Sequence, residues 1–196
     1  MKVALLVVIS YLIGSIPFGF LLARLRGVDI RKQGSGNIGA TNVWRNMGLL
    51  SGLLVLVLDA LKGVFCVWLG CYFAGGDVQL FTALAALAGH SWPVFLRFKG
   101  GKIIATALGV FLALDPLVTG LAALVWLVVV ALFRFVSLGS ILAMISLPVF
   151  MLVFSRPGES PGEIVMFSVI AAGIAIFKHL PNIKRLLSGT ETKIGR

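Results

Sequence analysis

The sequence predicts an all-α membrane protein, a polytopic bundle whose helices cross the bilayer several times. Hydrophobic residues make up 59% of its 196 residues and charged residues only 12%, about half the charged share of an ordinary soluble domain. So few charges cannot coat a water-facing surface, so lipid must cover much of the chain. Apolar runs that suit a hydrocarbon core of ~30 Å recur from one end to the other. We expect one integral membrane domain over residues 1–196.

Seven transmembrane helices are predicted, with five as the alternative. The stretch 103–133 is interrupted at Asp115 and Pro116. Its first part measures roughly 18 Å at 1.5 Å per residue, which is short for a full crossing. Both counts are odd and place the termini on opposite sides. The predicted spans are 3–23, 49–73, 80–96, the two parts of 103–133, 138–154 and 164–177.

Basic residues predict the orientation of these spans. Fourteen of the 17 lysines and arginines fall on one side, and basic loops mark the cytoplasmic face. The N-terminus is therefore expected outside and the C-terminus in the cytoplasm. The net charge of +10 lies in short loops, which suits anionic lipids or substrates better than nucleic acid. The opposite loops contain Asp77, Asp115, Glu159 and Glu163 with Lys2 and Arg156, and the cytoplasmic tail ends at Arg196.

Small and ionisable residues within the spans predict internal packing. Small residues let membrane helices approach closely, and Gly14, Gly19, Gly63 and Gly70 are expected at such positions. Ionisable groups are costly in lipid and normally face the bundle interior. We favour a structural ion pair between Asp59 and Lys62 and a structural hydrogen bond for His90.

Residues 34–45 form the first polar segment. Residues 34–39 match the spelling of a dinucleotide-binding G-x-G-x-x-G, but a charged loop precedes them instead of a core strand, which excludes a Rossmann site. Glycine-rich backbone amides can instead surround an anion. The alternative is a flexible cytoplasmic loop. The candidate residues are Gly34, Ser35, Gly36, Asn37, Gly39, Thr41, Asn42 and Arg45.

Residues 99–102 form the second polar segment, in which Gly100 and Gly101 stand between Lys99 and Lys102. Two glycines and two lysines before a helix suit a phosphate, and Thr106 follows as a candidate. Ile103 stands where a Walker A loop needs Ser or Thr. The alternative is that the lysines only anchor the chain at the membrane edge.

Residues 178–191 form the third polar segment. His179, Asn182 and Arg185 recur at helical spacing, so a helix would place them along one side. Ser137 and Ser140 add hydroxyl groups at the start of another span. The alternative is a basic tail that binds anionic lipid. We see no carboxylate cluster for a metal, so the sequence predicts chemistry without a metal or other cofactor.

The three segments resemble the three motifs of the bacterial acyl-phosphate:glycerol-3-phosphate acyltransferases, in order and spacing, over nearly the whole chain. The resemblance implies transfer of a fatty acyl group from acyl phosphate to glycerol 3-phosphate. The product would be lysophosphatidic acid, made at the cytoplasmic face of the cell inner membrane as the first acylation of phospholipid biosynthesis. A soluble enzyme that forms the acyl phosphate is an implied partner, and nucleic acid is not.

The resemblance also implies roles for the candidate residues. The expected catalytic residues are Ser35, Asn37, Arg45, Lys102 and His179. The expected substrate-binding residues are Gly34, Gly36, Gly39, Thr41, Asn42, Gly100, Gly101, Thr106, Ser137, Ser140, Asn182 and Glu191. One position departs from the family, which usually has glycine where this sequence has Ile103. A β-branched residue resists positive φ, so a loop that turns there would be strained.

Two other functions fit the same residues. The protein could be a transporter or channel for a phosphorylated solute, with the polar segments as an anion gate. Against this, the spans hold few polar residues to line a path. It could also be a lipid-binding scaffold without catalysis, which the departure at Ile103 favours.

Overall fold

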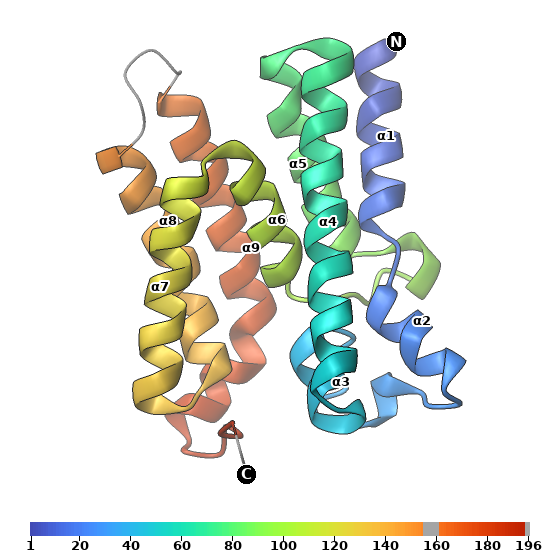
Figure 1. Ribbon diagram of the computed structural model, residues 1–196, viewed down its shortest axis with the longest axis vertical. Helices are drawn as coiled ribbons and strands as arrows, with labels where there is room; N and C mark the ends of the chain where they lie inside the picture. The colour runs from blue at the N-terminus through green and yellow to red at the C-terminus, as the bar shows by residue number, and fades with distance from the viewer. Residues whose placement is uncertain (155–160, 195–196) are drawn as a thin grey trace. The chain divides into compact units, whose positions relative to one another are not determined.

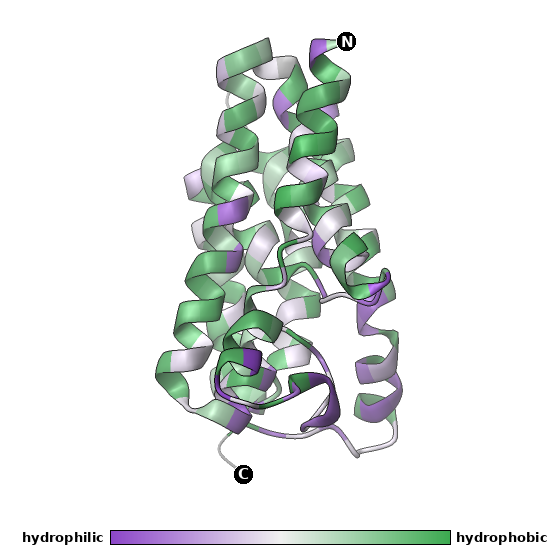
Figure 2. Ribbon diagram, turned by 90° about the vertical axis from the view of Figure 1, so that its right-hand side faces the viewer, coloured by the Kyte–Doolittle hydropathy of each residue, from purple (hydrophilic) through white to green (hydrophobic). Residues whose placement is uncertain are grey.

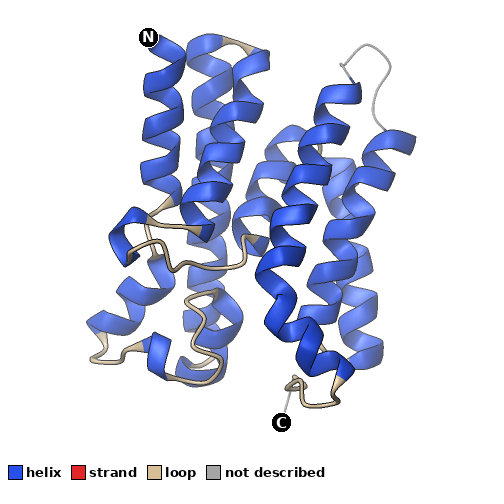
Figure 3. Cartoon of the chain, turned by 180° about the vertical axis from the view of Figure 1, so that it is seen from behind, coloured by secondary structure: helices blue, strands red, loops and turns tan. Residues whose placement is uncertain are grey.

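The computed structural model describes residues 1–154 and 161–194, and within them the chain is helical with no strand (Figures 1 and 3). Arg156, Glu159 and Arg196 lie outside these residues. The elements are α1 (Lys2–Gly14), α2 (Phe18–Leu25), η1 (Ile30–Lys32), α3 (Ala40–Met47), α4 (Leu49–Ala74), α5 (Gly76–Ser91), η2 (Val94–Leu96), α6 (Ile104–Leu114), α7 (Pro116–Phe133), α8 (Val136–Phe154) and α9 (Pro161–Leu187). The 3₁₀ helices are η1 and η2.

The described residues contain five stretches long and apolar enough to cross a membrane. The predicted all-helical membrane fold is therefore confirmed. The helix α5 has 16 residues and α6 has 11, both fewer than the roughly 20 that a span usually needs. Seven spans and the orientation of the termini stay predictions. The five candidate spans are Lys2–Leu25, Leu49–Ala74, Pro116–Phe133, Val136–Phe154 and Gly162–Leu187.

Prolines decide where several helices begin or end. The first predicted span is two helices, because α1 ends at Gly14 and Pro17 precedes the first residue of α2; proline disfavours helical backbone in the residue before it. The third predicted span stops early, at Ser91, ahead of Pro93. The split at Asp115 is confirmed: its carboxylate accepts the Val118 amide at 3.0 Å and Pro116 occupies the first turn of α7.

The chain forms two compact units, residues 1–114 and 115–196. In the first unit α1, α4 and α5 lie side by side and α6 packs against α4 (Figure 1). The four glycines expected to pack closely are confirmed, because a Cβ on each would overlap a neighbouring element. The overlapping residues are Ala86 for Gly14, Ile38 for Gly19, Thr106 for Gly63 and Thr82 for Gly70.

The first polar segment lies over an apolar cluster of the first unit. Figure 2 shows hydrophilic residues gathered from the end of α2 through α3, whereas α1 is almost wholly hydrophobic. Beneath them Ile30, Ile38 and Val43 are buried against Val55 of α4 and Leu96 of η2. Burial of these side chains holds the loop between η1 and α3 in place, and Leu96 brings the start of the second polar segment to the same cluster.

The second unit is a bundle of α7, α8 and α9, which lie side by side (Figure 1). Gly139 of α8 faces Trp126 of α7, and a Cβ there would approach the Trp126 carbonyl oxygen to 3.1 Å. The Trp126 indole also donates to the Ser140 hydroxyl at 3.3 Å. The helix α9 continues past the predicted span to Leu187 and so includes most of the third polar segment.

The close approach of α4 and α6 makes a stability prediction. A Cβ on Gly109 would overlap the carbonyl of Ala60, and a packed helix backbone cannot yield easily. We expect Gly109→Ala to lower the free energy of unfolding by about 1–3 kcal/mol, measured as a lower unfolding temperature in detergent. The control is Gly120→Ala in α7, where a Cβ meets nothing within 4 Å. Equal unfolding temperatures for the two variants would contradict the close approach.

Candidate active site

Asn42 organises the first polar segment. Its side chain, from the first turns of α3, is 2% exposed. The carbonyl oxygen Oδ1 accepts the Ser35 amide at 3.0 Å, and Nδ2 donates to the carbonyls of Gln33 at 3.0 Å and Asn37 at 2.8 Å. These bonds tie the loop onto the helix that follows it. Asn42 therefore positions the loop, and its amide group is occupied by that task.

Most amides of this loop bond within the loop. The Gly36 amide donates to the Gln33 carbonyl at 2.9 Å, and the Gly39 amide to Asn37 Oδ1 at 2.8 Å. The expected cradle, with all the loop amides turned toward one anion, is therefore wrong for the amides of Ser35, Gly36 and Gly39. The glycines serve the turn itself, since Gly34 and Gly36 have φ of +52° and +70°.

The start of α3 offers donors that the loop does not use. Among the described residues the amides of Ala40 and Thr41 have no acceptor. The first-turn amides of a helix, with its dipole, attract anions. Thr41 and Arg45 are one helical turn apart, so they share a face of α3, and the Ser35 side chain is exposed. Sequence reasoning missed Ala40, although Gly39 before a helical stretch was a signal for the helix start.

The second polar segment packs against the end of α5. The Gly101 amide donates to the His90 carbonyl at 2.9 Å, and the Gly100 amide to the Ser91 carbonyl at 3.2 Å. A Cβ on Gly101 would overlap the His90 ring, and one on Gly100 would overlap the His90 carbonyl. The two glycines are needed for this close packing. Their amides are therefore bonded to α5, and Lys102 is the half-buried residue that follows.

Ile103 adopts the strained backbone that its position requires. It has φ of +62° and a fully buried side chain. Its carbonyl accepts the Ala107 amide at 2.7 Å and so starts α6. The left-handed conformation costs an L-residue about 1–2 kcal/mol, and burial of a large aliphatic side chain offsets that cost. Packing is therefore what compensates for the missing glycine.

Polar groups are buried between α4, α5 and α6. The predicted ion pair is confirmed, with Lys62 Nζ 2.6 Å from Asp59 Oδ1. The predicted structural role of His90 is confirmed as well, since its Nδ1 lies 3.1 Å from Thr106 Oγ1. Thr106 is fully buried, so its hydroxyl supports the second polar segment through His90.

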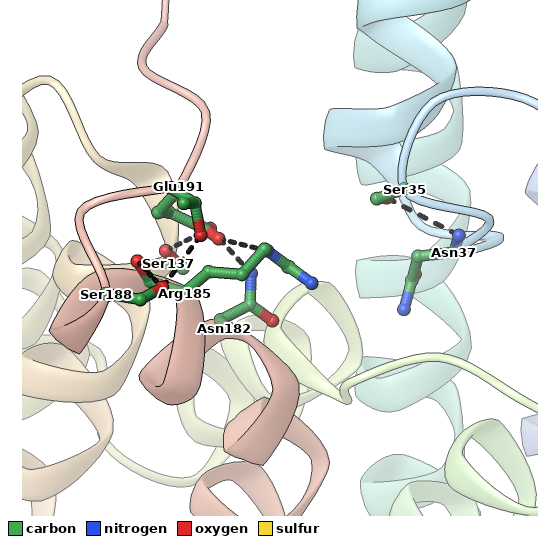
Figure 4. A network of polar contacts seen from close by, with 8 residues as sticks. Ser35, Asn37, Ser137, Asn182, Arg185, Ser188 and Glu191 are labelled. Carbon is green, nitrogen blue, oxygen red and sulfur yellow. Dashed lines mark hydrogen bonds and ion pairs between the residues drawn. The ribbon is translucent and has the colours of Figure 1, made fainter.

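Glu191 joins the residues of the third polar segment (Figure 4). Its Oε1 accepts from the Ser137 hydroxyl and from Asn182 Nδ2, both at 2.6 Å, and its Oε2 accepts from Arg185 Nε at 2.7 Å. Burial favours the neutral acid, but these three hydrogen bonds outweigh it and hold the pKa of Glu191 below its ordinary 4.5. The predicted placement of His179, Asn182 and Arg185 on one continuous helix is confirmed.

His179 has a defined tautomer. Its Nδ1 lies 2.8 Å from the Ala175 carbonyl oxygen, one helical turn back. A carbonyl can only accept, so Nδ1 carries the hydrogen, and a neutral ring then has its lone pair on Nε2. The side chain is 3% exposed.

Ser140 has a structural role, because its hydroxyl donates to the Val136 carbonyl at 2.9 Å and accepts from Trp126.

The apolar helices indicate an integral membrane protein, and the polar segments offer donors suited to phosphate. Apolar helices make up both units. In the first unit donors lie on α3 and before α6, and in the second unit they lie at the end of α9. Within the described residues, no group of three or more His, Cys, Asp or Glu side chains is placed to hold a metal ion.

Residues 4–189 match the family model for glycerol-3-phosphate acyltransferase. The glycerol-3-phosphate acyltransferase of Desulforamulus reducens is 53% identical over 194 residues, 98% of this chain and 95% of that protein. The one from Desulforudis audaxviator is 50% identical, over 98% and 96% of the two chains. Crystal structures of PlsY (YgiH), an integral membrane glycerol 3-phosphate acyltransferase, match with TM-scores of 0.93 and 0.91 at 44% and 43% identity, covering 100% of this chain and 96% of theirs. This chain therefore belongs to the glycerol-3-phosphate acyltransferase family and is an enzyme.

Ile103 allows strain and packing to be measured separately. Ile103→Gly relieves about 1–2 kcal/mol of backbone strain but removes a buried side chain worth about 2–5 kcal/mol. We expect it to lower the unfolding temperature. Ile103→Ala keeps the strain and loses most of the side chain, so it should be the least stable of the three proteins. A glycine variant more stable than the parent would show that packing does not compensate.

The network around Glu191 predicts a pH dependence. Because its pKa is lowered in the folded protein, the ionised carboxylate stabilises the fold fully above pH 4.5 and progressively less as the pH falls below that value. We expect Glu191→Gln to lower the free energy of unfolding by roughly 1–3 kcal/mol at neutral pH. The difference in unfolding temperature from the parent should shrink below pH 4.5. Glu163→Gln, at an exposed position of α9, is the control, and a difference independent of pH would contradict the assignment.

Proposed function

We propose that this enzyme transfers a fatty acyl group from acyl phosphate to glycerol 3-phosphate, giving 1-acyl-glycerol 3-phosphate (lysophosphatidic acid) and phosphate. The observation that carries the proposal is the match over the whole chain to structures described as the glycerol 3-phosphate and lysophosphatidic acid forms of a relative. Those two molecules are the acceptor and the product of one acylation. The reaction would be the first acylation of phospholipid biosynthesis.

The choice of donor rests on the residues and on the chemistry. Acyltransferases that use thioesters often carry an aspartate five positions after a histidine, and here those positions hold Phe95 and Lys184. An acyl phosphate is a mixed anhydride with a good leaving group. Its reaction needs a positioned alcohol and neutralised phosphates more than a strong acid. The abundance of cations and the scarcity of carboxylates in the three polar segments fit that need.

The reaction forms one bond and breaks one. A glycerol hydroxyl oxygen attacks the acyl carbonyl carbon, and the developing oxyanion collapses to break the bond between that carbon and the phosphate oxygen. Phosphate leaves with the electron pair. The hydroxyl proton passes to a base, for which two groups qualify: His179 through Nε2, and an oxygen of the donor's own phosphate.

The first unit supplies amides and cations for the donor phosphate in this proposal. The amides of Ala40 and Thr41 with the Ser35 hydroxyl would bind phosphate oxygens at the start of α3. Arg45 and Lys102 would neutralise its charge, and Asn37 would stabilise the oxyanion. Asn42, Thr106 and the loop glycines shape the two loops instead of contacting substrate. The loop glycines are Gly34, Gly36, Gly39, Gly100 and Gly101.

The second unit would bind glycerol 3-phosphate through α9. Glu191 fixes Asn182, Arg185 and Ser137 by accepting a hydrogen bond from each. Arg185 uses Nε for this bond, which leaves its terminal amino groups, on a side chain 39% exposed, to bind a phosphate. His179 lies one turn before Asn182 and would meet the glycerol part.

The setting of the enzyme is also part of the proposal. Residues 1–196 would work as one acyltransferase domain with seven spans, the N-terminus outside and the C-terminus in the cytoplasm. The polar segments would face the cytoplasm at the cell inner membrane, where a soluble enzyme that makes acyl phosphate would supply the donor. The positive-inside distribution of the basic residues supports this orientation.

Purified protein in detergent tests the proposal, with palmitoyl phosphate, labelled glycerol 3-phosphate, a metal chelator and no coenzyme A. We expect labelled lysophosphatidic acid from the parent. Arg45→Ala should lower kcat/KM by roughly 10–100-fold, the loss of a charge-assisted hydrogen bond to phosphate. The matched control is Arg24→Ala, which removes an exposed arginine from the end of α2 and should leave activity unchanged.

Three results would count against parts of the proposal. If the protein made no product from palmitoyl phosphate but made product from a coenzyme A thioester, the donor would be a thioester and not an acyl phosphate. Equal losses in Arg45→Ala and Arg24→Ala would remove Arg45 from the site. A loss of less than about tenfold in kcat for His179→Ala would exclude His179 as the base and leave the proton to the donor phosphate.

A further inference from the structure

The ion pair of Asp59 and Lys62 belongs to a larger buried cluster that the proposed chemistry does not use. Asp59 Oδ1 lies 2.6 Å from Lys62 Nζ and 3.6 Å from His90 Nδ1. The same His90 nitrogen lies 3.1 Å from Thr106 Oγ1. All four residues are at most 5% exposed. Ionisable groups within membrane helices are costly and normally mark a function.

Lys62 connects the cluster to the break in the first candidate span. Its ammonium group donates to the Ile16 carbonyl at 3.0 Å, between the end of α1 and the start of α2. It also lies 5.6 Å from the centre of the Phe18 ring. Backbone polar groups need protein partners at membrane depth. One lysine therefore joins α4 to the break and, through Asp59, to α5.

His90 connects the cluster to the second polar segment. Its carbonyl accepts the Gly101 amide, and its ring packs so closely on Gly101 that a Cβ there would overlap Nε2. The next carbonyl, of Ser91, accepts the Gly100 amide. The segment therefore rests on residues 90 and 91 by backbone bonds and ring contact together. The position of the imidazole therefore bears on the packing of Gly101, the residue before Lys102.

The geometry of this cluster differs from that of a proton relay. In a catalytic triad the carboxylate and the hydroxyl address opposite nitrogens of the histidine. Here Asp59 and Thr106 both lie nearest to Nδ1. The Thr106 hydroxyl is within hydrogen-bond distance of Nδ1, the Asp59 carboxylate lies on the same side of the ring, and the other edge of the ring faces the glycine of the loop.

We propose that Asp59, Lys62 and His90 are positioning residues that set the second polar segment, so that Lys102 can bind the phosphate of a substrate. The inference rests on the proposed function for its substrate. A buried ion pair stabilises little more than apolar residues of the same volume. We therefore explain the charged pair of Asp59 and Lys62 by its position beside His90, whose imidazole packs against the loop.

The test is a variant that removes both charges, Asp59→Asn with Lys62→Met, because loss of one charge alone would leave the other buried without a partner. We expect it to fold, with an unfolding temperature somewhat below that of the parent, because the Ile16 carbonyl loses the hydrogen bond from Lys62. Amide exchange in a peptide covering residues 97–103 should quicken by about tenfold or more. The KM for acyl phosphate should rise about tenfold while kcat changes by less than about threefold.

The matched control is Thr82→Val, which removes a buried hydroxyl of α5 that donates to carbonyls of its own helix. It should change neither exchange nor KM. His90→Asn is the second variant, used if the double variant does not fold; it keeps a polar group near Asp59 and removes the ring edge from Gly101. It should give the same faster exchange and higher KM.

Three outcomes decide the inference. Faster exchange with a higher KM, and an effect that is not additive with that of Lys102→Ala, supports it. Unchanged exchange in a folded variant overturns it. Faster exchange with an unchanged KM also overturns it, because the loop position would then not govern phosphate binding. The exchange measurement needs no turnover, so a parent that makes no product from palmitoyl phosphate would defeat the proposed function and still leave the coupling testable.

Discussion

Satisfaction of backbone polar groups where helices break is the constraint on which the first unit depends. Lipid offers no hydrogen bonds, so every interruption of a helix must find protein partners. Lys62 supplies one to the Ile16 carbonyl between α1 and α2, and α5 supplies carbonyls to the amides of Gly100 and Gly101. The interruptions are also where polar side chains can gather. The two polar segments of the first unit therefore lie at helix breaks whose backbone groups already have hydrogen-bond partners within the protein.

This constraint changes what the glycines of the two loops are for. A glycine-rich loop is commonly expected to turn its amides toward a phosphate. Here the amides of Gly36 and Gly39 close the first loop, and those of Gly100 and Gly101 dock the second. Other donors lie at the start of α3 and on basic side chains. Rigid loops that carry cationic side chains suit two substrates that each bring a phosphate.

The sequence was enough to predict features that depend on neighbouring residues. The break before α7 followed from Asp115 and Pro116, and the helical spacing of His179 and Asn182 followed from their positions. The break at Pro17 was missed because apolar residues continue on both sides of it. The bonding of the Gly100 and Gly101 amides could not be predicted, because their acceptors lie on α5, which only the fold brings near. The link from Asp59 to His90 was missed for the same reason.

Ile103 shows how one position can be strained and still fit the fold. Glycine would remove the strain, but it would also leave a cavity at the start of α6 where a fully buried side chain now packs. The strain lies next to Lys102, and the ring of His90 supports the same segment from α5. Packing from one side and hydrogen bonds from the other hold the turn in a conformation that it would not adopt alone. Strain maintained in this way keeps the backbone beside Lys102 in one conformation before any substrate binds, so that less ordering of this turn is left for the binding step.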